Sequence, residues 1–516
     1  MQAVILAAGM SKNLDGFLAP GDNKCMVEIN GVKLIDRMLH QLDNRNLQRI
    51  IMVVGYGKDA LKEHIATLAI NTPIVFIDNN DYEVTNNIYT LALAKDYLVE
   101  DDTLLFQADL IFESSIIDKL LDDKRETLAL VDKYEGWMDG ACIKIGKNDT
   151  IDKFVVRRKF KFNDIKDYYK TVNIYKFSKR FSEKYYVPFL EAFSQAMGYN
   201  EYYEEVLHVM TVLDEPHIRV KRLSGERWFE IDNLQDIDIA ASMFHESDDE
   251  KVRLLQERYG GFWRYPKIKD LNFLVNPYYP PQKLLNEIKA NVEKLITSYP
   301  SSHKVTSLLA AKNFHVDPEN VLVGNGASEI IKCLMNHVLK GKIGITHPVF
   351  SEFTNRIEDN QVEVFDTAKN DFHYTADDLM EYFGKTDVKN IIVVNPDNPS
   401  GNYIPKADML RLIDWCDEKD INIVVDESFV DFADEEDASL VNQEALDGKT
   451  HLSVVKSISK SHGIPGLRVG IFASDNQEYL EIMRDDLAIW NVNSVAEYFM
   501  QICDKYSDDY QKSLVK

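Results

Sequence analysis

The stretch SISKSHGIPGLRVG, at residues 457–470, places a lysine between two serines and an arginine eight positions further on. A run rich in hydroxyls and glycine fits a polar loop on a folded domain. It also fits a lysine amine that forms an imine with an aldehyde cofactor, beside an arginine that holds the cofactor's phosphate. The choice between a polar loop and an imine-forming lysine decides the fold and the chemistry expected for the second half of the chain. The surrounding sequence distinguishes these two interpretations.

Length and composition limit the classes of protein to consider. The chain has 516 residues, which suits two or three domains, and its 45% hydrophobic and 28% charged residues are typical of a soluble globular protein. Its net charge of −25 argues against a nucleic acid or an anionic membrane surface as the main partner. The scattered cysteines predict no disulfide framework and a cytoplasmic location. The first apolar run is too short to span a bilayer and predicts a β-strand.

The order of the segments predicts two α/β domains. In the first half, short β-branched runs such as AVILAA, RIIMVVG and TLLFQAD alternate with helical stretches such as KLIDRMLHQL. This alternation predicts parallel βαβ units in a Rossmann-like domain. An acidic, polar stretch at residues 244–253 indicates a boundary between domains 1–245 and 246–516. Beyond it, strand-like runs such as NIIVVNPDNPSG and NIVVDESF end in polar residues.

Four segments of the second half carry chemistry. They are GNGAS (324–328), NPDNPSG (395–401), VVDESF (424–429) and SISK (457–460). Each alone is an ordinary turn or helix cap. Together, in this order and at strand ends, they resemble the fold-type I pyridoxal-phosphate aminotransferases. The similarity is to the branch with histidinol-phosphate aminotransferase and threonine-phosphate decarboxylase, and it covers the chain from about residue 252 onward.

The resemblance implies a pyridoxal 5'-phosphate site. Lys460 matches the lysine that forms the imine and then moves the substrate proton. Asp426 matches the carboxylate that keeps the pyridine nitrogen protonated, and Asn398 the residue that hydrogen-bonds the ring hydroxyl. The residues that match the phosphate-binding and ring-stacking positions are Ala327, Ser328, Phe350, Ser457 and Arg468.

Two departures from the family pattern affect the expected reaction. Phe429 stands where the aminotransferases carry a tyrosine that touches the ring hydroxyl, which favours another reaction, decarboxylation included. The chain ends at Lys516, before the small C-terminal subdomain with its substrate-binding arginine. The sequence therefore predicts a fold-type I domain that is incomplete at its C-terminus.

The beginning of the chain holds a second set of motifs. LAAGMSKNLDGFLAPGDNKCMVEINGVKLIDRML (6–39) runs from a strand into a glycine loop, and a lysine follows before a helix. A short glycine loop alone is also found in generic Rossmann-like turns. The whole stretch resembles the sugar-phosphate and choline-phosphate nucleotidyltransferases. This implies that Lys24 stabilises the α-phosphate and that Lys12 replaces the arginine which binds pyrophosphate. The loop residues implied to wrap the nucleotide are Leu6, Ala7, Ala8 and Gly9.

Two acidic segments match the magnesium ligands of these enzymes. LLFQADLIF ends a buried strand at Asp109, and WFEIDNLQDIDIA offers Asp232, with Glu230 as a further candidate. Magnesium prefers carboxylate, phosphate and water oxygens, so one aspartate from each of two strands suits it.

Within this group, the first half is most similar to the bacterial choline-phosphate cytidylyltransferases. The similarity rests on NNIYTL (86–91), YEGWMDG (134–140) and YNEYYEEVL (199–207). It implies that Asn86 reaches the nucleotide. It also implies that three residues surround an alkylammonium group: Trp137, Tyr202 and Glu204.

A fusion of the two domains suggests consecutive reactions. We expect a bifunctional enzyme for phosphonate tailoring, which transfers a cytidylyl group from CTP to 2-aminoethylphosphonate with Mg²⁺. The pyridoxal-phosphate domain would supply this amine by transamination and pair two chains into a homodimer. One alternative is a phosphocholine or phosphoethanolamine cytidylyltransferase with a decarboxylase-like domain. Another is a sugar-1-phosphate nucleotidyltransferase whose second half serves as a dimerisation module.

Overall fold

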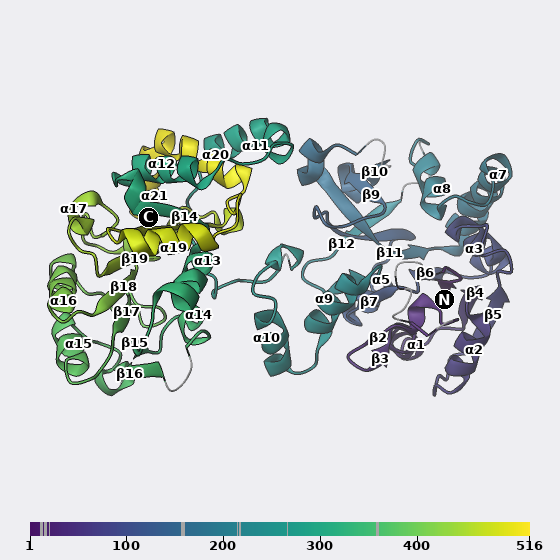
Figure 1. The fold of residues 1–516 in the computed structure, drawn as a ribbon. Coiled ribbons are helices and arrows are strands. Elements are labelled where there is room, and N and C mark those ends of the chain that lie inside the picture. Colours follow the sequence, from purple (N-terminus) through teal and green to yellow (C-terminus); the bar gives the residue numbers. More distant parts are fainter. Residues whose placement is uncertain are drawn as a thin grey trace. The chain divides into compact units, whose positions relative to one another are not determined.

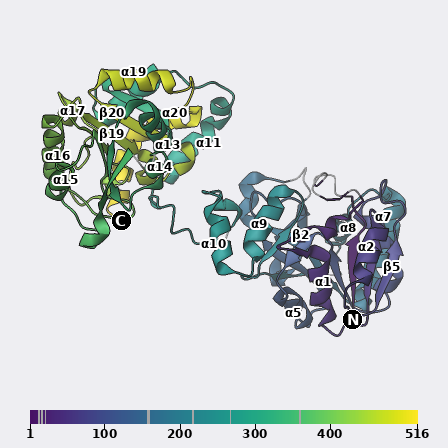
Figure 2. The same ribbon diagram turned by 60° about the horizontal axis from the view of Figure 1, so that its bottom comes forward.

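A computed structural model shows two compact units, Met1–Asp270 and Leu271–Lys516 (Figures 1 and 2). It describes residues 1–10, 14, 18–19, 21–155, 160–213, 215, 218–265, 267–357 and 361–516. The first unit extends past the boundary expected at residue 245. The reason is that helix α10 (Asp248–Gln256) follows α9 (Leu234–Phe244) closely, and Leu255 and Tyr265 pack into the same apolar cluster as α9.

The first unit is built on a mixed sheet of nine strands among the described residues, in the order β10-β9-β11-β6-β1-β4-β5, with β8 beside β11 and β12 beside β8. Strand β1 runs parallel to β4 and β6, whereas β11 runs antiparallel to β6. The strands are β1 (Gln2–Ala7), β4 (Ile50–Val54), β5 (Ile74–Asp78), β6 (Thr103–Gln107), β8 (Thr127–Lys133), β9 (Cys142–Ile145), β10 (Ile151–Val155), β11 (Tyr168–Phe177) and β12 (Arg219–Arg222).

Helices and short strand pairs surround this sheet. The pairs are β2 (Glu28–Ile29) with β3 (Val32–Lys33), and β7 (Leu110–Phe112) with β13 (Trp228–Glu230). The remaining helices of the unit are α1 (Leu34–Asp43), α2 (Lys58–Ala66), α3 (Asn87–Leu93), α4 (Lys95–Leu98), α5 (Ser115–Leu121), α6 (Lys179–Phe181), α7 (Val187–Met197) and α8 (Tyr203–Met210).

The period-two alternation of strand side chains explains the core of the first unit. Along β1, Ala3 and Ile5 belong to one apolar cluster, whereas Val4 and Leu6 belong to another. A strand covered on both faces reads as a continuous apolar run, which is how AVILAA reads in the sequence.

The second unit is built on a seven-stranded sheet among the described residues, in the order β14-β20-β19-β18-β17-β15-β16. Strand β20 is antiparallel to both its neighbours, and the other pairs are parallel. The strands are β14 (Val321–Asn325), β15 (Ile343–His347), β16 (Val362–Asp366), β17 (Asn390–Val394), β18 (Asn422–Asp426), β19 (Leu452–Ser457) and β20 (Val469–Ser474).

Helices pack against this sheet in groups. Helices α11 (Gln282–Ile296), α12 (His303–Phe314) and α20 (Ser494–Ile502) lie together, and α15 (Ala376–Phe383) lies beside α16 (Lys406–Glu418) (Figure 1). The others are α13 (Ala327–Cys333), α14 (Ser351–Thr354), α17 (Gln443–Leu446), α18 (Ile458–Ser461), α19 (Gln477–Asp486) and α21 (Ser507–Leu514). Across the described residues, every helix is too short or too polar to cross a membrane.

Candidate active sites

A cavity of about 470 Å³ opens where β1 ends in the first unit. Asn23 fixes the loop there, because its Nδ2 donates to the carbonyls of Ala7 and Tyr56, each at 2.8 Å. All the residues expected to bind the nucleotide line this cavity, except Lys12, which lies outside the described residues. They are Leu6, Ala7, Ala8, Gly9 and Asn86.

Lys24 joins two carboxylates at the edge of this cavity. Its Nζ lies 2.8 Å from Asp109 Oδ2 and 2.7 Å from Asp232 Oδ1. Asp109 follows β6 and Asp232 follows β13, so two strand ends meet at one ammonium. Burial alone would lower the pKa of Lys24, but the charges of Asp109 and Asp232 outweigh burial and raise this pKa above its ordinary value.

Glu230 completes a cluster of carboxylates. One oxygen from each of Asp109, Glu230 and Asp232 can be chosen so that all three lie within 4.8 Å of one another. Asn173 Nδ2 donates to Glu230 Oε1 at 2.9 Å, and the buried Lys170 Nζ lies 3.2 Å from Glu230 Oε2. Asp109 Oδ1 is buried without a hydrogen bond from any described residue. A free buried oxygen among hard ligands has the chemistry to bind Mg²⁺, and the role of these carboxylates as magnesium ligands stays a prediction.

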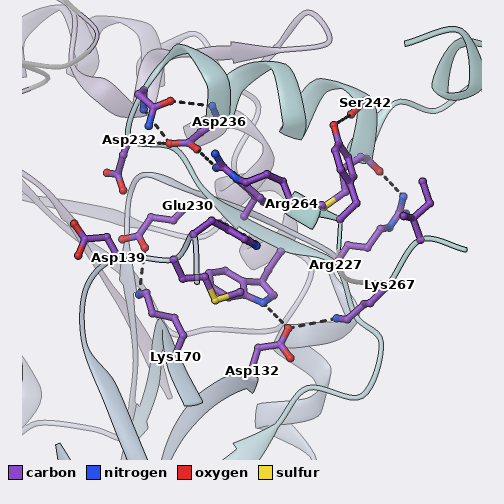
Figure 3. A pocket seen from close by; sticks show the side chains of 18 of the residues that line it. Asp132, Asp139, Lys170, Arg227, Glu230, Asp232, Asp236, Ser242, Arg264 and Lys267 are labelled. Atoms are coloured by element: carbon purple, nitrogen blue, oxygen red, sulfur yellow. Dashed lines mark hydrogen bonds and ion pairs between the residues drawn. The ribbon is translucent and has the colours of Figure 1, made fainter. Parts of the chain in front are cut away.

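Glu230 and Asp232 of this cluster also line a second cavity, of about 670 Å³ (Figure 3). Asp109 lines the first cavity, whereas Glu230 and Asp232 line the second. The carboxylates therefore stand between two spaces that can each hold a ligand. In Figure 3, Glu230 and Asp232 lie toward one side of the second cavity and Lys267 toward the other.

The three residues expected around an alkylammonium group are not brought together. Trp137 lines the second cavity, and Tyr202, which is 58% exposed, lines the first. Glu204 lines neither, because α8 turns it into the core of the first unit, near the phenols of Tyr175 and Tyr203. Burial raises the pKa of Glu204 to about 7, and its Oε2 accepts no hydrogen bond from the described residues.

Several residues of this site were not expected from the sequence. Lys170 and Asn173 lie on β11, in the run YYKTVNIYKF. Polar residues inside an apolar strand could have indicated that these two belong to a site. Arg264 and Lys267 belong to the stretch GFWRYPKIK, which has no helix or strand periodicity. Both line the second cavity.

In the second unit, the parallel strands bring the expected cofactor residues to one edge of the sheet. Val394, at the end of β17, pairs with Asp426 on β18, and Asp426 pairs with Val455 on β19. Asn398 therefore follows the strand beside Asp426, and Ser457 and Lys460 follow the strand on its other side. Ser457 N donates to Ser428 Oγ at 3.1 Å, which ties two of these loops together.

Asp426 and Lys460 are both perturbed by burial. Asp426 is 2% exposed, accepts a hydrogen bond from Ser428 N at 2.9 Å, and has its pKa raised by burial. The pKa of Lys460 is lowered, chiefly by burial and further by the charge of Arg468, against the opposing effect of Asp426. Lys460 Nζ lies 4.4 Å from the ring centre of Phe429 and 5.8 Å from that of Phe350.

The residues expected to bind the cofactor's phosphate include Ala327 and Arg468, which lie where β14 pairs with β20, at the start of α13. Gly326 has a φ of +80°, and a Cβ there would lie 2.5 Å from Arg468 Nη2. Among the described residues, no side chain forms an ion pair or hydrogen bond with the Arg468 guanidinium. An unpaired guanidinium beside the amides of Ala327 and Ser328 fits a phosphate group.

Asn276 was not singled out in the sequence, yet it holds the backbone of the lysine loop. Its amide N–H donates to the carbonyl of Lys460 at 2.8 Å, and its Nδ2 donates to the carbonyl of Ser461 at 2.9 Å. The same Nδ2 lies 2.8 Å from Ser513 Oγ on α21. The sequence NPYYPP at residues 276–281 predicts an irregular segment, but it does not predict that Asn276 contacts the lysine loop.

Comparison with known proteins gives the same two-part organisation. Residues 3–152 match the family of the MobA-like NTP transferase domain, and residues 270–510 match that of aminotransferase class I and II. The chain is thus a nucleotidyltransferase domain joined to a class I/II aminotransferase domain. This confirms both resemblances and the α/β fold class expected from the sequence.

Individual relatives cover different shares of the chain. A CMP-5'-(3-aminopropyl)phosphonate synthase of Streptomyces rubellomurinus is 28% identical over 97% of this chain and 79% of its own length. An L-serine phosphate decarboxylase of Sulfurospirillum multivorans is 29% identical over 45% of this chain, which spans only 61% of that relative. The solved structure of a CTP:phosphocholine cytidylyltransferase from Streptococcus pneumoniae is 22% identical, covers 47% of this chain and 99% of its own, and has a TM-score of 0.39.

Proposed function

We propose that the first unit transfers a cytidylyl group from CTP to a small amino-phosphonate, with 2-aminoethylphosphonate as the preferred acceptor. We further propose that the second unit, with pyridoxal 5'-phosphate, forms that amine. One observation carries the first part: Lys24 and three carboxylates stand between two cavities. A nucleotide in one cavity and an acceptor in the other would meet at this cluster.

The residues at the cluster suit phosphoryl chemistry. Asp109 and Asp232, with Glu230, would hold Mg²⁺, which supplies a divalent charge opposite phosphate oxygens. Lys24 adds a fixed ammonium at the same point, where charge increases as pyrophosphate leaves. A phosphonate oxygen is already anionic, so the attack on the α-phosphorus needs orientation more than a general base.

In the second unit, the named side chains suit pyridoxal phosphate. This cofactor supplies an electron sink for a bond that breaks at the substrate's α-carbon. The buried Asp426 would keep a pyridine nitrogen protonated, and Arg468, beside Gly326, would bind the phosphate. Lys460, with its lowered pKa, is able to bind the aldehyde and then to move a proton.

The amine-forming step has two candidates. Transamination of an aldehyde gives the amine with a second amino acid as donor. Decarboxylation of a phosphono or phospho amino acid gives it directly. Phe429, whose ring centre lies 4.4 Å from Lys460 Nζ, provides no hydroxyl for the cofactor, and the similarity to a serine phosphate decarboxylase favours the second candidate.

Pyrophosphate release tests the first unit. CTP, UTP and ATP would each be combined with Mg²⁺ and with 2-aminoethylphosphonate, 3-aminopropylphosphonate, phosphoethanolamine, phosphocholine or glucose-1-phosphate. We expect release with CTP and an amino-phosphonate, and its loss in Asp232→Asn. Release only with glucose-1-phosphate would refute the proposal and favour a sugar nucleotidyltransferase.

A second assay tests the other unit. The protein with pyridoxal phosphate would receive either phosphonoacetaldehyde plus an amino acid donor, or a phosphono or phospho amino acid alone. Formation of an amine with release of CO₂ supports decarboxylation, and formation of a 2-oxo acid from the donor supports transamination. Lys460→Ala should abolish either reaction. An absence of both reactions in the unchanged protein would refute the catalytic role and leave a dimerisation module.

A further inference from the structure

Arg264 occupies an unexpected position in the second cavity. Its guanidinium carbon lies 4.8 Å from the ring centre of Trp137 and 5.9 Å from that of Phe229. These two rings are stacked on each other at 5.2 Å, nearly parallel. A cation within about 6 Å of an aromatic centroid is attracted by the electron-rich face. The ring expected to receive the substrate's ammonium group therefore already has a cation, supplied by the chain itself.

Two anchors hold this cation in place. Arg264 Nη2 lies 2.7 Å from Asp236 Oδ1, and Nη1 donates to Gln235 Oε1 at 2.8 Å. Asp236 in turn accepts from the backbone N–H of Asp232 at 3.0 Å. The Arg264 and Asp236 side chains are 12% and 7% exposed. With both terminal nitrogens bonded, the planar guanidinium is fixed over the rings rather than free to leave them.

A ligand ammonium must then bind elsewhere in the cavity. Asp139 lines the cavity on the same side as Glu230 and Asp232 (Figure 3), is exposed, and forms no ion pair with any described residue. A primary ammonium has three N–H donors for such carboxylates, whereas a quaternary ammonium has none and depends on aromatic faces.

We propose that Arg264 is a specificity-determining residue of the acceptor site: it excludes quaternary ammonium groups from Trp137 and Phe229 and so selects acceptors with a primary amine. This inference rests on the proposed cytidylyl transfer. It goes beyond it by assigning the choice between amine classes to one side chain of the segment that follows α10.

The test compares kcat/KM for 2-aminoethylphosphonate and phosphocholine in the full chain with CTP and Mg²⁺. Arg264→Met removes the charge and keeps the bulk, and Arg264→Lys keeps a charge. We expect the ratio of the two kcat/KM values to shift toward phosphocholine by about tenfold in Arg264→Met. The reason is that no guanidinium then competes with the quaternary ammonium for the faces of the aromatic rings. The ratio should shift little in Arg264→Lys. Arg264→Gln, which can still hydrogen-bond Asp236, replaces the Met variant should that variant fail to fold.

Arg258 provides a matched control. It also pairs with an α9 carboxylate, Asp238, and lies 5.3 Å from the ring centre of Tyr265, but it does not line the cavity. Arg258→Met should keep the wild-type ratio. The inference is overturned if Arg264→Met and Arg258→Met share one ratio, or if Arg264→Lys shifts as far as Arg264→Met.

A binding measurement separates this inference from the proposed function. Titration with tetramethylammonium, followed by tryptophan fluorescence, needs no turnover. We expect a response in Arg264→Met that the wild type lacks. Equal responses in the two proteins would refute the role of Arg264, whereas a failure of the unchanged protein to use any amino-phosphonate would refute only the proposed reaction.

Discussion

Lys24 is the residue on which the proposed nucleotidyl transfer depends most directly. Among the described residues it is the cation that pairs with both Asp109 and Asp232, so its removal leaves two carboxylates opposing the incoming phosphates. We predict that Lys24→Met lowers kcat for pyrophosphate release by about 10²- to 10³-fold, as for loss of one preorganised charge stabiliser. Lys33→Met is the control, since Lys33 pairs with Glu28 on the neighbouring hairpin. A variant at position 24 with unchanged kcat would contradict this role.

Glu204 leads to a prediction about pH and stability. Its pKa rises from 4.5 to about 7 on folding because it is buried. The folded state therefore holds a proton that the unfolded state loses, and stability falls as pH rises from about 4.5 to about 7. Glu204→Gln removes this dependence. The free energy of unfolding of the variant, relative to that of the wild type, should therefore increase by on the order of 3 kcal/mol from pH 5 to pH 8.

The measurement is the unfolding midpoint of both proteins at pH 5 and pH 8. Glu205→Gln, one residue further along α8 and partly exposed, should show no such pH-dependent gain. If the two variants behave alike, Glu204 is not a neutral core carboxyl, and its expected place beside a substrate cation regains support.

Single residues show what could be predicted from the sequence and what could not. Asp109 and Asp232 each follow a strand, and strand ends are visible in the sequence, so their closeness was predictable, whereas their shared contact with Lys24 was not expected. Tyr202 and Glu204 are two residues apart, but α8 begins between them. Helical geometry then turns one side chain outward and the other into the core. Matching residues by position in a motif cannot detect that rotation.

At the scale of elements, the β14–α13 turn and the start of β20 would together form the proposed phosphate site. A side chain at Gly326 would meet Arg468 and would also face a positive φ. We predict that Gly326→Ala raises the dissociation constant of pyridoxal phosphate by at least about tenfold, measured by absorbance titration. Gly448→Ala separates the two causes, because Gly448 has a φ of +72° and a Cβ there would meet nothing within 4 Å. Equal dissociation constants in both variants would mean that Arg468 does not bind the phosphate.

The direction of strands was partly readable from connection lengths. Long crossovers with helices predict the parallel pairs β17–β18 and β18–β19, as observed. Strand β20 follows β19 after a short connection through α18, and such a connection suits an antiparallel neighbour. Strand β11 also runs antiparallel to β6, and it brings Lys170 and Asn173 to Glu230. Periodicity alone predicts the strand β11 but not which strand it pairs with. Lys170 and Asn173 could therefore not be predicted as neighbours of Glu230.

At the scale of the whole molecule, each unit has apolar clusters of its own. One cluster of the first unit combines α9 with residues from beyond position 245, namely Leu255, Phe262 and Tyr265. Tyr265 also bonds Ser242 at 2.7 Å through its hydroxyl. The polar stretch at residues 244–253 marks a change of composition rather than an end of packing. Helix α10 exposes most of its polar side chains, but its Leu255 packs against the cluster.

This packing predicts different behaviour for two fragments of the first unit. Residues 1–270 keep Tyr265 and Arg264, whereas residues 1–245 lose both and expose the apolar residues that they cover. Burial of one large apolar side chain contributes roughly 1.5–3 kcal/mol, so the shorter fragment should unfold several degrees lower. Its KM for the acceptor should rise at least about tenfold while its KM for CTP changes little, because Arg264 and Lys267 line only the second cavity. Thermal unfolding and pyrophosphate release are measured on both fragments. Equal unfolding midpoints together with equal KM values for the acceptor would show that the segment after α9 is a linker and does not contribute to the acceptor site.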